Sequence, residues 1–189
     1  YNHLFDFSFP QTGIKEDTPF WAGPAVFNAL KDDNLLDAVE SIIGDEIYSN
    51  PIQHVRIKVP ESEAPKDENG LVKFGATPWH QDAGYWQKTR GSDNAVTCWL
   101  ALSYAWKQNG GMQFITGSHR GKIAEHDNVS QRSEMKSGLG TKVDPSQSIS
   151  ESLEPGDVTF QHCRMLHHTG GNYTDTPRRG LITHFWAGD

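Results

Sequence analysis

After residue 50 the chain consists of short apolar stretches separated by proline, glycine and polar turns, and this pattern is what most limits its fold. The stretches are rich in β-branched and aromatic residues and too short for typical helices, so each is predicted to be a strand. Many short strands in succession are typical of an all-β barrel or a double-sheet jelly roll. The predicted strands are residues 52–60, 95–105, 111–118, 156–166 and 179–187.

A helical pattern precedes these strands. From Pro24 to Gly44 apolar residues recur at helical spacing, with proline suited to a first turn and glycine to a C-terminal cap. We expect one or two short helices here, packed outside the β core. The charged residues 61–70 are predicted to be a solvated loop, and the polar residues 120–150 a long loop or lid. No internal repeat is visible, so we expect one domain over residues 1–189.

Charge and hydropathy exclude several kinds of partner. The formal net charge is −7 and no basic run occurs, which disfavours nucleic acid. The longest mostly apolar stretch, residues 95–106, is too short to cross a bilayer. Cys98 and Cys163 lie inside strand-like segments and are predicted to be buried free thiols, as in a reducing compartment. We therefore expect a cytoplasmic protein that acts without nucleic acid or membrane; its oligomeric state is left open.

The stretch TPWHQDAGYW, residues 77–86, carries the first chemical signal. His80 and Asp82 stand two apart, so on a strand both would face one way while Gln81 turns away. Alone, such a pair is more often hydrogen-bonded or solvated than metal-binding. Two histidines and one carboxylate are, however, the ligand set of non-haem iron(II) sites, and also of some hydrolytic zinc sites.

The third ligand of such a site would come from a distant strand. The segment CRMLHHTGGN offers His167 or His168, and the residues alone leave the choice open. Arg178 follows His167 by eleven residues. A guanidinium binds a carboxylate through two parallel hydrogen bonds and stays charged when buried. It would therefore suit the far carboxylate of a keto-acid co-substrate that chelates iron, whereas a zinc hydrolase would have no need of it.

Three blocks of the sequence, TPWHQDAGYW, GGMQFITGSHRG and LEPGDVTFQHCRMLHHTGGNYTDTPRRG, resemble successive blocks of the phytanoyl-CoA dioxygenase family. They run in family order over roughly residues 47–186. The resemblance implies a double-stranded β-helix, which is a form of jelly roll. It also implies an enzyme that depends on iron(II), 2-oxoglutarate and dioxygen. It also implies that His80, Asp82 and His167 bind iron and that Arg178 binds 2-oxoglutarate.

Further co-substrate contacts follow from the same resemblance. Thr169 matches a hydroxyl position that helps to hold the carboxylate, and Trp99 matches an aromatic position beside it. The strand of residues 52–60 matches one that supplies another contact, for which we select Gln53, with His54 and Lys58 as alternatives. The chain departs from the family in having His168 where glycine is common. Its N-terminal helical portion also looks shortened.

Other histidines and arginines are given structural roles. His162 and His184 are expected to belong to the core or the pocket wall. Trp186 shares the strand parity of Arg178, so it is about equally expected to line the pocket or to fill the core. Arg179 has the opposite parity and is expected to face away from the pocket.

The resemblance implies an enzyme that hydroxylates a C–H bond of a small molecule and releases succinate and CO2, with ascorbate as a supporting reductant in vitro. Two alternatives remain: a non-catalytic jelly-roll protein that binds a ligand, and an inactive family member. An inactive member should have lost an iron ligand or the arginine, and this sequence retains all three ligands and Arg178.

Overall fold

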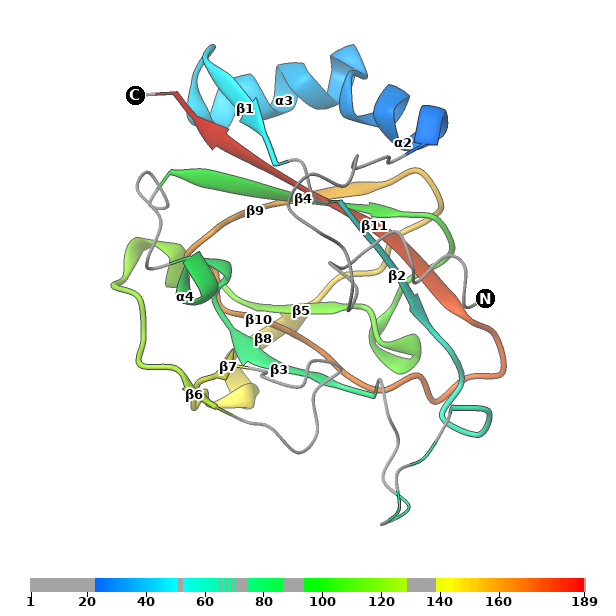
Figure 1. Ribbon diagram of the computed structural model, residues 1–189. Coiled ribbons are helices and arrows are strands. Elements are labelled where there is room, and N and C mark those ends of the chain that lie inside the picture. Colours follow the sequence, from blue (N-terminus) through cyan, green and yellow to red (C-terminus); the bar gives the residue numbers. More distant parts are fainter. Residues whose placement is uncertain are drawn as a thin grey trace.

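The computed structural model describes residues 23–50, 53–64, 66, 68, 70, 75–86, 94–128 and 139–188. Within them, two antiparallel sheets face each other, and two helices cover the outer face of the larger sheet (Figure 1). Short 3-10 turns occur at Lys107–Asn109, Ser118–Arg120 and Pro145–Gln147. None of the helices in these ranges has the length and apolar character needed to cross a lipid bilayer.

The larger sheet is organised around its longest strand. That strand, β11, pairs with β4 on one side, and β9 follows β4. On the other side β11 pairs with two short strands, β2 at its beginning and β1 at its end. The five strands are β1 (Ile47–Ser49), β2 (His54–Lys58), β4 (Ala95–Ala101), β9 (Val158–His162) and β11 (Arg178–Ala187).

The smaller sheet has the order β3-β10-β5-β8. Its strands are β3 (Thr77–His80), β5 (Met112–Ile115), β8 (Ser148–Ser150) and β10 (His167–Thr169). A separate two-stranded ribbon joins β6 (Asp127–Asn128) to β7 (Leu139–Gly140). The short helix α4 (Asp82–Trp86) begins two residues after β3 ends.

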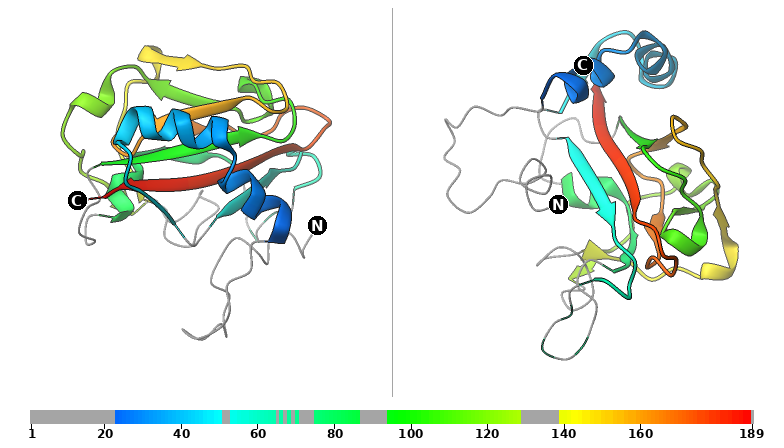
Figure 2. Two further views of the ribbon diagram at one scale, coloured as in Figure 1. Left: turned by 90° about the horizontal axis from the view of Figure 1, so that it is seen from above. Right: turned by 90° about the vertical axis from the view of Figure 1, so that its right-hand side faces the viewer.

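Two helices, α2 (Gly23–Leu30) and α3 (Asp33–Ile43), lie across the larger sheet, as Figure 2 shows from above. The Asp32 side chain caps α3 by accepting hydrogen bonds from the backbone amides of Asn34 and Leu35. Gly44 ends the helix with a φ of 95°, a conformation that favours glycine. Val39 and Ile43 of α3 then pack on the outer face of β4 and β11.

The strand β4 shows why the sheets stay together. Its outward residues Val96 and Cys98 pack under α3, while its inward residues Trp99 and Ala101 pack with Met112 and other residues between the sheets. Both faces are therefore covered, and six of its seven residues are buried. This explains why its sequence is a nearly continuous apolar run instead of an alternating one.

The mainly β jelly roll and the outer helices confirm the fold expected from the sequence, including two helices between Pro24 and Gly44. Two expectations were wrong in detail. Residues 120–150 are not entirely a loop, because β8 supplies the edge of the smaller sheet and part of the segment is ribbon. The connection predicted between residues 167 and 178 contains β10, a central strand of that sheet.

Candidate metal centre and co-substrate pocket

Three side chains that could hold a metal ion meet at one end of the smaller sheet. His80 ends β3, Asp82 begins α4 and His167 begins β10, directly opposite His80 in the register. Their ligand atoms all lie within 4.8 Å of one another. The Asp82 Oδ1 atom is 3.6 Å from the Nε2 atoms of both His80 and His167. Two imidazoles and one carboxylate therefore converge on a single point.

His80 and Asp82 reach this point differently from our expectation. They do not share a strand face, because β3 stops at His80 and the chain turns into α4. Gln81 does turn away from the cluster, and it is buried. Its side chain accepts a hydrogen bond from the Ala124 amide at 2.8 Å and donates one to the Arg164 carbonyl at 2.7 Å. Gln81 thus anchors the turn that brings Asp82 under His80.

Backbone carbonyls fix the orientation of both imidazoles. The Nδ1 atom of His80 lies 2.8 Å from the Pro78 carbonyl, and that of His167 lies 2.9 Å from the Met165 carbonyl. A carbonyl only accepts, so each Nδ1 carries the hydrogen and each Nε2 presents a lone pair. Burial, followed by the neighbouring His80, lowers the pKa of His167 to about 4. The ring is therefore neutral near pH 7, as metal binding requires.

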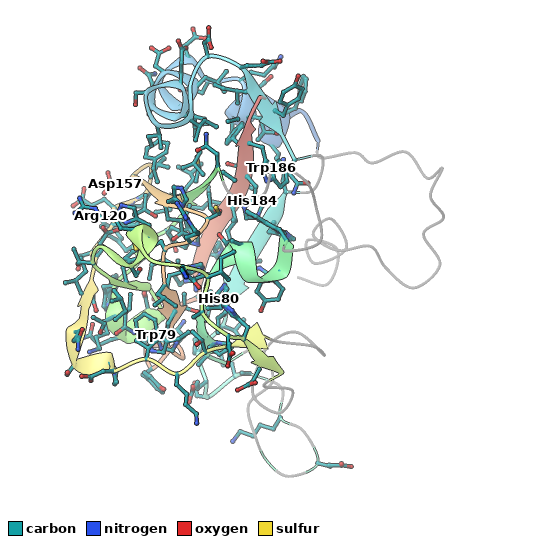
Figure 3. All side chains as sticks on the ribbon, turned by 90° about the vertical axis from the view of Figure 1, so that its left-hand side faces the viewer. Trp79, His80, Arg120, Asp157, His184 and Trp186 are labelled. Carbon is teal, nitrogen blue, oxygen red and sulfur yellow. The ribbon has the colours of Figure 1, made fainter. Side chains whose placement is uncertain are left out.

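Asp82 is oriented from the opposite sheet. Its Oδ2 atom accepts a hydrogen bond from the Thr97 hydroxyl at 2.6 Å, and the Thr97 oxygen lies 2.9 Å from Nδ1 of His184. Because the hydroxyl hydrogen is given to the carboxylate, His184 must donate from Nδ1 to Thr97. His184 of β11 and His80 of β3, both labelled in Figure 3, line the same cavity.

The charge of Asp82 results from opposing effects. Burial alone would raise the pKa of Asp82, but the nearby imidazoles of His167 and His80 outweigh burial and hold that pKa below its usual value. The carboxylate is therefore ionised at neutral pH. One oxygen is occupied by Thr97, so Oδ1 is the atom that faces the two histidines.

The structure also separates the two adjacent histidines. His167 is buried and faces Asp82, whereas His168 points to the other face of β10. There its ring stacks on Trp79 at 5.0 Å, and its Nδ1 atom lies 2.6 Å from the Thr77 carbonyl. Within the described part of the chain, only His167 of this pair joins the cluster.

Two buried cations mark a second group of polar side chains. Arg178 and Lys58 face each other across the β2–β11 register, and each is about 3% exposed. Lys58 Nζ donates to the Thr169 hydroxyl at 2.8 Å and to the carbonyls of Gly75 and Gly170. All three acceptors are neutral oxygens. Arg178 donates from Nη2 to the Gly110 carbonyl at 2.8 Å.

The two groups line one cavity of about 250 Å³ between the sheets. Trp99 lies in its wall, with the Arg178 guanidinium 5.2 Å from the indole centre. His184 is also a wall residue, as expected. The lining consists of His54, Arg56, Ile57, Lys58, Thr77, His80, Asp82, Tyr85, Trp86, Thr97, Trp99, Met112, Gln161, His167, Thr169, Arg178, Ile182 and His184.

Gln53 does not belong to this lining, which differs from our expectation. It precedes β2, and its amide donates to the Asn50 carbonyl. The register of β2 on β11 instead places Lys58 opposite Arg178, so this alternative candidate lines the cavity. Trp186 also lies outside the lining; it packs against Trp86 at 5.3 Å between ring centres.

Several site residues were not singled out from the sequence. Thr97 and Arg56 lie in strands that looked structural, and only the register of the sheets reveals that they face inward. Arg179 points to the other face of β11 and is not in the lining, as its parity indicated. His162 stands on β9 outside the cavity, where its Nδ1 accepts a hydrogen bond from the Arg164 amide.

A family model for phytanoyl-CoA dioxygenase matches residues 11–180. Among curated proteins, the chain is 28% identical over 162 residues to "Probable alpha-ketoglutarate-dependent hypophosphite dioxygenase" of Stutzerimonas stutzeri, covering 81% of this chain and 54% of that protein. It is 29% identical over 120 residues to peroxisomal phytanoyl-CoA dioxygenase of Homo sapiens, covering 62% of this chain and 35% of that protein. The chain thus spans about half the length, or less, of these relatives.

Solved structures agree with the fold. EvdO2 from Micromonospora carbonacea var. aurantiaca, in complex with 2-oxoglutarate, superposes with a TM-score of 0.64 at 23% identity and covers 99% of this chain and 80% of its own. The epimerase SnoN, in complex with Fe3+, alpha-ketoglutarate and nogalamycin RO, has a TM-score of 0.65 at 22% identity. The match covers 87% of this chain and 59% of the SnoN chain. At these identities the likeness shows the shared jelly roll.

Proposed function

The chain belongs to the phytanoyl-CoA dioxygenase family, and from this premise we propose that it is an iron(II)- and 2-oxoglutarate-dependent dioxygenase. Its reaction is the hydroxylation of a C–H bond in a small molecule, with release of succinate and CO2. One observation carries the proposal: the His80–Asp82–His167 cluster and the Arg178–Lys58 pair line the same cavity.

The residues present fit an iron(II) ion. Two neutral imidazole nitrogens and one carboxylate oxygen are the donors of the non-haem iron facial triad, which leaves other positions open. His80, Asp82 and His167 would hold the ion, while Thr97 and the backbone carbonyls keep the three donors oriented. When bound, iron with 2-oxoglutarate and dioxygen supplies the oxidising power for the C–H bond.

The residues also fit the co-substrate. Arg178 and Lys58 are buried cations, and a carboxylate between them would offset their charges and accept their hydrogen bonds. Thr169 would add a hydroxyl contact, and Trp99 would pack along one side. These residues would hold the far carboxylate, and the buried Trp99 and Met112 side chains supply an apolar wall beside it.

The substrate is a small molecule that enters the remaining part of the cavity. The relatives' names cite unlike compounds, hypophosphite, phytanoyl-CoA and ectoine, so family membership does not identify it. Ascorbate is proposed as a supporting reductant in vitro, and the cytoplasm as the compartment. No observation in the described residues favours either of the two non-catalytic alternatives, which remain outcomes of the test.

An anaerobic titration tests the proposal without requiring the substrate. Purified protein is loaded with iron(II), 2-oxoglutarate is added, and visible absorption is recorded. We expect a saturable charge-transfer band, because chelation of iron by the keto acid produces one. A protein that binds iron but forms no band would be an inactive member or a binding protein. A protein that binds neither would contradict the proposal.

A further inference from the structure

A second cavity, of about 540 Å³, lies at another edge of the jelly roll. It opens between β8 and β9, which are the last strands of the smaller and the larger sheet. Phe114, Ile149, Leu153 and Met165 give it apolar walls. Among the described lining residues only Gln161 is shared with the first cavity, so this is a separate site.

Both sheets contribute polar side chains to the second cavity. Thr159 and Gln161 are alternate residues of β9 and stand opposite Trp99 and Thr97 of β4, so they point between the sheets. Glu151 directly follows β8 and lines the cavity from the smaller sheet. A carboxylate, a hydroxyl and an amide therefore border the same space.

Each of these three side chains has a buried oxygen without a partner. Within the part of the chain that the structure describes, Glu151 Oε2, Thr159 Oγ1 and Gln161 Oε1 make no hydrogen bond. Gln161 is only 3% exposed, so bulk water does not readily replace the missing donor. A buried acceptor that lacks a hydrogen bond costs free energy, and a bound molecule that donates to it recovers that cost.

The charge of the second cavity is negative. Glu151 is the one ionisable carboxylate or cation among its described lining residues. No lysine, arginine or histidine of the described residues forms a salt bridge with it. Burial raises the pKa of Glu151, and no neighbouring cation counteracts that effect. A cationic ligand would supply the missing partner.

We infer that the second cavity binds a small primary alkylammonium ion, held by Glu151, Thr159 and Gln161. An ammonium group has three N–H donors and no acceptor, which matches three oxygens that lack donors. Its hydrogen bond to the carboxylate is charge-assisted. The apolar walls accept the alkyl chain. The inference does not depend on the proposed function, because neither iron nor 2-oxoglutarate is assigned to this cavity.

Two methionine methyl groups distinguish the cavities, because Met165 lines the second and Met112 the first. The whole chain is labelled with carbon-13 at its methionine methyl groups and loaded with zinc(II) in place of iron(II), which keeps the NMR signals sharp. Met165→Leu and Met112→Leu assign the signals. The labelled protein is then titrated with butylammonium, 1-butanol or butyrate, and the metal-free chain is titrated in parallel.

We expect butylammonium to shift the Met165 signal saturably, with or without metal, and to leave the Met112 signal in place. Butanol has the same chain without the charge and should bind at least about tenfold more weakly. Butyrate should cause no shift, because its charge has the same sign as that of Glu151.

Three variants assign the effect to the polar side chains. Glu151→Gln keeps the shape and removes the charge, so it should weaken butylammonium at least about tenfold. Thr159→Val removes one neutral acceptor and should weaken it about three- to tenfold. Glu154→Gln is the control, because Glu154 is exposed and outside the lining, and it should change nothing. Melting temperatures show whether each variant is folded.

Several results would overturn the inference. They are equal affinities for butylammonium and butanol, butylammonium binding that survives Glu151→Gln, a shift of the Met112 signal alone, and no saturable shift of the Met165 signal. The last result would mean that the cavity holds only water. If Glu151→Gln does not fold, the comparison of butylammonium with butanol on the unmodified protein decides.

Discussion

At the scale of single residues, the adjacent histidines show what strand geometry adds to sequence. His167 and His168 are chemically identical, and the residues alone could not rank them. In β10 they point to opposite faces, one toward Asp82 and the other toward Trp79. The resemblance to the family selected His167, which lies in the cluster with His80 and Asp82, and its binding of iron stays a prediction.

His167→Ala and His168→Ala form a matched pair for iron binding. The first removes a proposed ligand and should reduce iron content after desalting to that of the EDTA-treated protein. The second removes a ring on the outer face of β10 and should keep one iron per chain. Metal analysis by mass spectrometry measures both. The opposite result, with iron lost only in His168→Ala, would show that the assignment is wrong.

Arg178→Ala should separate co-substrate binding from metal binding. Removal of one partner of a buried charge pair costs about 3–5 kcal/mol, so half-saturation by 2-oxoglutarate should rise at least about a hundredfold. Iron content should not change, because Arg178 is not one of the three clustered donors. Arg179→Ala on the outer face is the control. An unaltered saturation curve in Arg178→Ala would move the role to Lys58.

The sequence could not identify some residues of the site, because strand register decides which side chains face the cavity. Lys58 and Gln53 are both polar residues of one short segment, and a shift of one residue exchanges the inward and outward sets. Thr97 likewise looks like any β-branched residue of a buried strand. Its contact with Asp82 joins β4 to helix α4 across 15 residues of sequence, which no local pattern encodes.

At the scale of elements, the change from β3 to α4 is the least predictable part of the site. The sequence indicated a strand through Asp82, but Gln81 forms hydrogen bonds to residues 43 and 83 positions away and turns the chain. The strand β8 was not predicted for the same reason, namely that distant contacts determine its structure. Its polar residues Ser148 and Ser150 carry no strand signal, and pairing with β5 decides its structure.

The strand β11 supplies an element-scale prediction through Gly180. A Cβ at this position would lie 2.4 Å from Cζ2 of the buried Trp99 indole. Gly180→Ala should therefore force Trp99 aside and lower the free energy of unfolding by about 1–3 kcal/mol. Urea denaturation followed by tryptophan fluorescence measures the change.

The control for this prediction is Gly170→Ala, where the added methyl would meet its nearest neighbour at 4.0 Å. That variant should keep its stability close to the original. Equal stability of both variants would mean that Trp99 can move without cost, and the wall it forms would then be less rigid than its burial indicates.

At the scale of the whole molecule, the jelly roll was predictable because it depends on the number and length of strands, not on their register. The helices were predictable from the spacing of apolar residues and from Gly44.

Burial of the site should also make the stability of the protein depend on pH. It lowers the pKa values of His167, His168 and His184.

Stability of the metal-free protein should fall as the pH drops from about 6.5 to 4. In this range the unfolded chain binds protons on these histidines more readily than the folded chain does, so acid favours unfolding. With a folded pKa of about 4, His167 alone should lower the free energy of unfolding by about 2 kcal/mol at pH 5 relative to neutral pH. Urea midpoints of EDTA-treated protein at several pH values measure this, and His167→Gln should flatten the slope. A midpoint that rises on acidification would contradict the expectation.

Two polar bridges cross the cavity from the larger sheet, Thr97 to Asp82 of α4 and Lys58 to Thr169 of the smaller sheet. Each bridge involves residues that the proposed reaction needs, so selection for the chemistry also preserves the spacing of the sheets. The rest of the cavity wall can then change during divergence, and the same oxidising apparatus can be inherited intact while new metabolites are adopted.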